Sequence, residues 1–112
     1  MTPKLTRKLT LEARVQTSDG AGGFTETWEE RGTLWAEVKH RSGRQVRGRP
    51  AASVSLTSYR ILVRAAPFDS PSRPKPEQRF REGARIYRIL AVAEADPQAR
   101  FLTCFADEEV PG

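Results

Sequence analysis

The sequence predicts an all-β fold: a small antiparallel β-barrel of about six strands with long loops. Apolar and polar residues alternate along several stretches, as they do in strands with one buried face. Clusters of Gly, Pro and Asp separate these stretches at regular spacing, and no stretch shows a convincing helical period. The 112 residues are enough for one modest core, so we expect a single domain over residues 1–112.

The first two strands are expected to form a hairpin. The apolar residues of the first strand all occupy odd positions: Leu5, Leu9, Leu11, Ala13 and Val15. A turn cluster at 18–23 supplies glycines that tolerate positive φ. Phe24 and Trp28, separated by alternating threonines, indicate the return strand. Because the turn cluster is long, we expect a flexible tip.

A third strand is expected after Gly32, which interrupts the alternation. Thr33–Val38 resumes it, with Trp35 on the otherwise polar face. A Trp on such a face predicts packing beneath a loop or against a neighbouring subunit. A basic loop over residues 39–50 follows and ends at a proline.

The fourth strand is expected over Ser53–Ala65. Its two halves bury opposite parities, which predicts a β-bulge near Thr57 or Ser58. Four prolines then make residues 67–78 a stiff, extended connection. Such a proline-rich connection cannot be a central strand or a helix.

Two further strands complete the expected sheet. Arg81–Ala84 predicts a tight turn, and Ile86–Ala93, apolar on both faces, indicates a central strand. Asp96 and Pro97 turn the chain into a last strand over residues 100–106. An acidic tail follows at 107–109.

The residue types that carry catalysis are sparse. His40, the only histidine, has no acid–base partner nearby in sequence, and Cys104 lies between apolar residues, as a core thiol would. No metal-ligand spacing stands out, and no apolar run is long enough to cross a bilayer. A solvated or inter-subunit face explains the acids of the second strand better than acid–base work: Glu26, Glu29 and Glu30. We therefore predict no enzyme activity, no cofactor and no metal.

Positive charge is concentrated in one segment. The chain has 19 Lys and Arg against 14 Asp and Glu, and the whole net charge of +5 resides in residues 39–49, which contain no acid. A balanced scaffold with one basic segment predicts contact with a polyanion, although such runs are often only solvated surface. No aromatic residue is interleaved, so stacking on bases is not indicated. The cations are Lys39, Arg41, Arg44, Arg47 and Arg49.

Five runs of the sequence, in this order and spacing, resemble the phage head–tail joining proteins. These are also called head closure or stopper proteins of long-tailed phages, and gene transfer agents have similar proteins. The resemblance covers residues 5–106. The runs are Leu5–Leu11, Asp19–Trp28, Thr33–Val38 with Ser42-Gly43-Arg44, Tyr59–Arg64 and Gly83–Ile89.

The resemblance implies a head–tail connector β-barrel that forms a homo-oligomeric ring of six or twelve copies. Such a ring lies at the head–tail junction of a virion or phage-like particle assembled in the bacterial cytoplasm, from a phage, prophage or gene transfer agent. An adaptor or portal ring lies above it, and a tail terminator or tail tube protein below it. The ring closes the exit channel, retains the packaged double-stranded DNA and offers the surface for tail attachment.

Charge and resemblance together lead to one hypothesis. The five cations of residues 39–49 face the channel and contact the DNA backbone. The hairpin tip and the tryptophan contact a neighbouring subunit or ring through Asp19, Gly20, Gly22, Gly23 and Trp35. The alternative is a free-standing nucleic-acid-binding barrel of the OB or Sm-like kind, which would bind DNA or RNA without reading its sequence.

Overall fold

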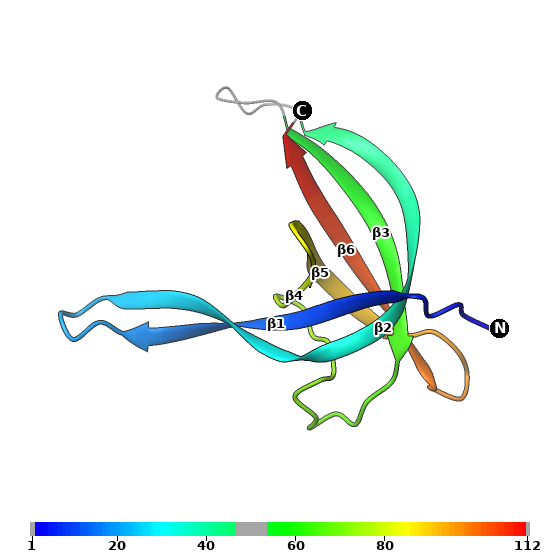
Figure 1. Cartoon of the computed structure of the whole chain (residues 1–112), viewed down its shortest axis with the longest axis horizontal. Coiled ribbons are helices and arrows are strands. Elements are labelled where there is room, and N and C mark those ends of the chain that lie inside the picture. The colour runs from blue at the N-terminus through cyan, green and yellow to red at the C-terminus, as the bar shows by residue number, and fades with distance from the viewer. Residues whose placement is uncertain (1, 47–53, 112) are drawn as a thin grey trace.

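Six antiparallel strands form one closed barrel in the computed structural model, which describes residues 2–46 and 54–111 (Figure 1). The strand order around the barrel is β1-β2-β3-β6-β5-β4, and pairing of β4 with β1 closes it. The predicted fold class is confirmed. Within the described residues no helix could cross a membrane. The strands are β1 (Arg7–Ser18), β2 (Phe24–Val46), β3 (Val54–Arg64), β4 (Arg79–Glu82), β5 (Arg85–Glu94) and β6 (Phe101–Pro111).

The barrel interior is filled by apolar side chains. They come from alternate positions of the strands, as the period of two requires, so that Leu9 and Leu11 of β1 meet Ile61 and Val63 of β3. Cys104 of β6 is fully buried among them, which confirms the predicted core thiol. The other members are Ala36, Tyr59, Phe80, Tyr87, Ile89, Leu102 and Ala106.

Two of the six strands differ from the expected set. The expected second and third strands are one continuous strand, β2. The short strand β4 was not expected, and its last two residues, Arg81 and Glu82, belong to the expected tight turn. Gly32 interrupts the apolar pattern because it lies at a bulge: Leu11 pairs with Gly32 and Glu12 with Glu30. At φ 149° Gly32 adopts a backbone conformation that favours glycine.

The bulge expected near Thr57 or Ser58 lies in the partner strand instead. β3 pairs with β6 without a register shift, so β3 itself is regular. In the pairing of β2 with β3, His40 lies opposite Tyr59 and Ser42 opposite Ser58, which leaves Arg41 of β2 as the extra residue. The parity change in β3 therefore coincides with the bulge in its partner strand β2.

Two elements project from the barrel (Figure 1). Beyond Glu12, β1 pairs only with β2, so Ala13–Ser18 and Phe24–Glu29 form a two-stranded arm. The second projection, here called the three-stranded extension, consists of Ser42–Val46, Val54–Ser58 and Asp107–Pro111. The last strand was expected to stop at residue 106, but pairing with β3 carries it through the acidic tail.

The outward face of β5 departs from the expected central strand. Tyr87 and Ile89 are buried inside the barrel as expected, but Leu90 lies at a bulge against β6 and is 55% exposed. Every strand of a closed barrel has two neighbours, and yet only its inner face is covered. The apolar run at Ile86–Ala93 therefore belongs to a strand of the barrel wall whose outer face is not covered.

Candidate nucleic-acid and assembly interfaces

The basic segment starts on the barrel wall. Lys39 and Arg41 belong to β2 and are exposed, and Lys39 pairs in register with Arg60 of β3. Arg60 in turn pairs with Phe105 of β6, and the Arg41 guanidinium lies 5.5 Å from the centre of that ring. Arg60 thus lies between Lys39 and Phe105 across neighbouring strands, and the Arg41 guanidinium lies near the same ring. Glu37 is an acid of this surface, with its Oε1 3.3 Å from Lys39 Nζ.

Residues 39–46 form a strand, which corrects the expectation of a basic loop over 39–50. They pair with residues 54–60 of β3, so their backbone groups have hydrogen-bond partners that a count of charges along the sequence cannot show. Arg44 lies in this strand opposite Leu56. Arg47 and Arg49 lie outside the described residues.

Arg60 is a cation of this surface that the charge count missed. Its outward parity in β3 was visible in the sequence, but its neighbours are decided by register. Only the pairing of β3 with β2 and β6 brings it beside Lys39 and Phe105. Its separation in sequence from the basic run hid this proximity.

The same register brings acids to the three-stranded extension. Asp107 lies opposite Ser58, and its Oδ1 accepts a hydrogen bond of 3.0 Å from the Ser58 hydroxyl. Glu108 lies opposite Thr57 and is buried. The extension thus has Arg44 on β2 and Asp107 and Glu108 on β6, with β3 between them.

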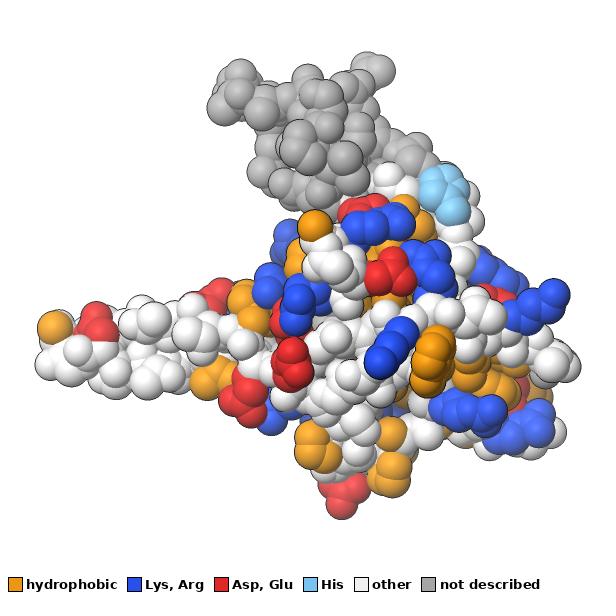
Figure 2. Space-filling view, in the orientation of Figure 1, with side chains coloured by type: hydrophobic (Ala, Val, Ile, Leu, Met, Phe, Trp, Pro, Cys, Tyr) orange, Lys and Arg blue, Asp and Glu red, His pale blue; other side chains and the backbone are white. Residues whose placement is uncertain are grey.

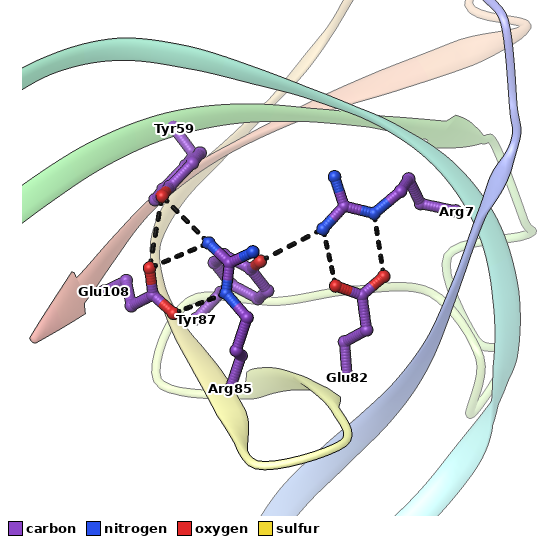
Figure 3. Close-up of polar contacts among 6 residues, drawn as sticks. All are labelled: Arg7, Tyr59, Glu82, Arg85, Tyr87 and Glu108. Atoms are coloured by element: carbon purple, nitrogen blue, oxygen red, sulfur yellow. Dashed lines mark hydrogen bonds and ion pairs between the residues drawn. The ribbon is translucent and has the colours of Figure 1, made fainter. Parts of the chain in front are cut away.

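A polar network closes the barrel beneath this extension (Figure 3). Arg85 Nε donates to Glu108 Oε2 at 2.8 Å, and the Tyr59 hydroxyl donates to Glu108 Oε1 at 3.1 Å. Beside it, Arg7 Nε donates to Glu82 Oε2 at 2.8 Å. Two guanidinium groups thus face two carboxylates, so this mouth of the barrel carries no net charge from the network.

Burial and pairing set the pKa values in the network. The Arg85 guanidinium lowers the pKa of Glu108 against the opposing effect of burial, and Arg7 likewise lowers the pKa of Glu82. Burial raises the pKa of Tyr59, and the adjacent Glu108 carboxylate adds to this effect. Near neutral pH both carboxylates are ionised, and β6 is tied to β3 and β5 by charged hydrogen bonds.

The tip of the arm is organised by Asp19. Its Oδ1 accepts hydrogen bonds from the backbone N–H groups of Ala21, at 2.8 Å, and Gly23, at 3.1 Å. These bonds lower the pKa of Asp19. Gly20 and Gly22 have φ values of 80° and 86°, which glycine adopts without strain. The tip expected to be flexible is therefore a hydrogen-bonded turn, and it carries Phe24 with 72% of its surface exposed.

Trp35 lies on the outer wall and is 54% exposed. It pairs in register with Lys8, and together with Leu5 and Arg64 it lines a shallow groove. The Arg64 guanidinium lies 5.7 Å from the centre of the Phe101 ring. No loop among the described residues buries this tryptophan, so a contact with a neighbouring subunit stays the prediction. We call this surface the Trp35 groove.

Sequence-predicted interface residues fall into two separate places. Asp19, Gly20, Gly22 and Gly23 lie together at the tip of the arm, whereas Trp35 lies on the barrel wall. The structure thus presents three distinct outer surfaces: the arm tip, the Trp35 groove and the basic strand of β2.

Catalytic chemistry finds little support in the described residues. Burial raises the pKa of Cys104 to about 12, so this thiol stays protonated. No group of His, Cys, Asp and Glu in residues 2–46 and 54–111 is arranged to hold a metal ion.

This small barrel has a filled interior, a two-stranded arm and a three-stranded extension, so its distinctive features lie on its outside, as is typical of proteins that act by assembly. The chain belongs to the phage head completion protein family, whose sequence model matches residues 1–109. This family assignment makes it a structural protein of phage or phage-like virions. Among curated proteins, none is significantly similar to this chain.

Solved structures agree with this assignment. A chain of the structure described as the virion of a native gene transfer agent (GTA) particle is 50% identical, with a TM-score of 0.89. The match covers 99% of this chain and 100% of that chain. The solution structure of protein SF1141 from Shigella flexneri 2a shares the fold at 22% identity and a TM-score of 0.66, covering 95% and 94% of the two chains.

Proposed function

We propose that this protein forms a homo-oligomeric ring at the head–tail junction of a phage-like particle. The ring closes the DNA exit channel below the portal and adaptor, and its lower side receives the tail terminator or tail tube protein. The family assignment and the 50% identity to a chain of a GTA virion support this role.

The filled barrel interior favours a DNA channel that lies between copies and not within one copy. Because apolar side chains occupy the interior and the polar network covers one mouth, DNA cannot pass through the barrel itself. In a ring each outer surface is repeated around the axis. The central passage is then lined by whichever surface each copy turns inward.

The observation that carries the DNA contact is the exposed cationic strand. Lys39 and Arg41 project from the outer wall with Arg60 beside them, and the same strand continues to Arg44. Repeated around a ring, these cations would make a positive collar for phosphate groups, whose binding needs charge and no base recognition. We therefore place Lys39, Arg41, Arg44, Arg47 and Arg49 at the channel.

Replacing the five cations with serine tests this placement. Particles that carry the fivefold variant should lose most of their packaged DNA, because the collar no longer holds the phosphates. Nuclease-protected DNA per particle is the measurement. A matched control replaces Arg31 and Arg88, outward arginines elsewhere on the barrel, with serine, and these particles should keep their DNA.

Equal DNA content in the variant and control particles would mean that these cations do not hold the DNA in the channel. Only the role in joining head and tail would then remain. The alternative, a free-standing nucleic-acid-binding barrel, gives a different pattern. The purified chain would then bind DNA with an affinity that falls steeply in salt, and it would not co-purify with heads and tails.

A further inference from the structure

The outer part of the arm carries an exposed aromatic residue, Phe24, and only negative charge. Residues 15–27 contain Asp19 and Glu26 but no Lys or Arg. Figure 2 shows acidic and uncharged side chains toward the end of the arm, with Lys and Arg gathered on the barrel. Phe24 and Glu26 are two residues apart in β2 and therefore project from the same face. Glu26 has only a loose, exposed partner, Arg14, at 3.7 Å.

The Trp35 groove has the complementary character. Its apolar lining includes Leu5, Leu34 and Trp35. Lys8 lies beside Trp35 in register, Arg64 lines the groove, and both cations are exposed. Within the described residues neither forms an ion pair. The groove thus offers an apolar floor and cations to a partner that brings an aromatic side chain and a carboxylate.

A chain cannot fill its own groove. Phe24 and Trp35 lie eleven residues apart on β2, which is roughly 35 Å of strand. The arm projects away from the barrel that carries Trp35 (Figure 1). Only the arm of another molecule can reach the groove.

We infer that the arm of one copy docks into the Trp35 groove of the next copy, with Phe24 against Leu5 and Trp35 and with Glu26 facing Arg64. The inference rests on the proposed ring. Because the two contact surfaces differ, the contact is head-to-tail, and head-to-tail contacts are the kind that close rings. The cations of the groove favour an acidic occupant over a basic or neutral one, and the acidic arm of another copy is such an occupant.

Engineered cysteines test the contact in assembled particles. The double variant Phe24→Cys with Trp35→Cys should form, on oxidation, a ladder of disulfide-linked oligomers of this chain. Both positions are exposed, so the fold tolerates the changes, and buried Cys104 stays unreactive. The matched control pairs Phe24→Cys with Phe68→Cys, because Phe68 is another exposed aromatic residue, at 76%. The control should form no disulfide-linked oligomers.

Outcomes separate this inference from the proposed function. If microscopy shows the ring at the junction but no ladder forms, the docking contact is wrong and the ring stands. A ladder in the Phe68→Cys control alone, or a disulfide to a different particle protein, also overturns the contact. Absence of a ring overturns both.

A charge exchange gives a second, independent test. Glu26→Arg alone and Arg64→Glu alone should each lower incorporation into particles, by roughly tenfold for a close interfacial ion pair. The double variant should restore it, because the opposite charges again face each other. Failure of the double variant to recover incorporation would mean that these two residues do not meet.

Discussion

Glu108 illustrates how neighbours determine the role of a single residue. In the sequence it belongs to an acidic tail, whereas in the structure it is buried between Arg85 and Tyr59. Glu12 behaves similarly: it alternates with the core residues of β1, and yet it is only 5% exposed because Arg79 and Arg81 donate hydrogen bonds to it. Both carboxylates hold together strands that are distant in the sequence.

Replacing Glu108 with glutamine should lower the free energy of unfolding near pH 7. We expect a loss of about 1–2 kcal/mol, because the charged hydrogen bonds from Arg85 weaken while solvent already screens that half-exposed arginine. Denaturant unfolding measures the change. Glu94→Gln, at an exposed carboxylate, is the matched control and should change stability little.

The same variant should alter the pH dependence of stability. The pKa of Glu108 is lowered in the folded state from its ordinary value of 4.5. Its contribution is therefore complete above pH 4.5 and is lost as the pH falls through the lower folded-state pKa. The glutamine variant should lose less stability on acidification than the native chain. An identical pH profile in both proteins would mean that the Arg85 pair does not stabilise the fold.

At the scale of elements, β2 is the strand that defines the molecule. It forms one side of the arm, a wall of the barrel and one strand of the three-stranded extension. The bulges at Arg31 and Arg41 lie where the arm and the extension meet the barrel. A bulge admits an extra residue and bends a strand without ending it. One strand can therefore carry Phe24, Trp35 and the basic residues to three different surfaces.

The arm tip gives a prediction at this scale. Asp19→Ala removes the acceptor for the N–H groups of Ala21 and Gly23, so their amide hydrogen exchange should become several-fold faster. The melting temperature should hardly change, because the tip lies outside the barrel. Asp19→Asn keeps an acceptor and should restore slow exchange, and Thr25→Ala is a control on the same arm. Unchanged exchange in Asp19→Ala would show that Asp19 does not organise the turn.

The whole molecule depends on closure through β4, its shortest strand. Phe80 of β4 is fully buried in the core, and Leu11 is its register partner on β1. Apolar side chains from all six strands fill the same interior. Loss of one large core side chain therefore weakens packing throughout the barrel.

Phe80→Ala should destabilise the protein by about 3–5 kcal/mol, a large fraction of the stability of a small domain. Thermal or denaturant unfolding measures it. Phe68→Ala is the control, since that ring is exposed and contacts the Arg73 guanidinium 3.9 Å away; it should cost less than about 1 kcal/mol. Similar losses in both variants would mean that β4 does not close the core.

Much of the fold was predictable because alternation is a local property. The odd-numbered apolar residues of β1, the core position of Cys104 and the first hairpin follow from patterns within a few residues. The candidate site was less predictable. The basic segment was recognised by charge, but its strand conformation and its neighbour Arg60 depend on β3, which follows an intervening segment of the chain.

By itself, the sequence determined that the chain is all-β, which positions face the core, where the surplus positive charge lies and which family the chain resembles. Only the tertiary structure decided that Gly32 marks a bulge, that the acidic tail is a strand, and that Lys8, Trp35 and Arg64 share one outer surface. The physical reason is register. Side-chain alternation is set within a strand, whereas the partners of each residue are set by how distant strands align when the barrel closes.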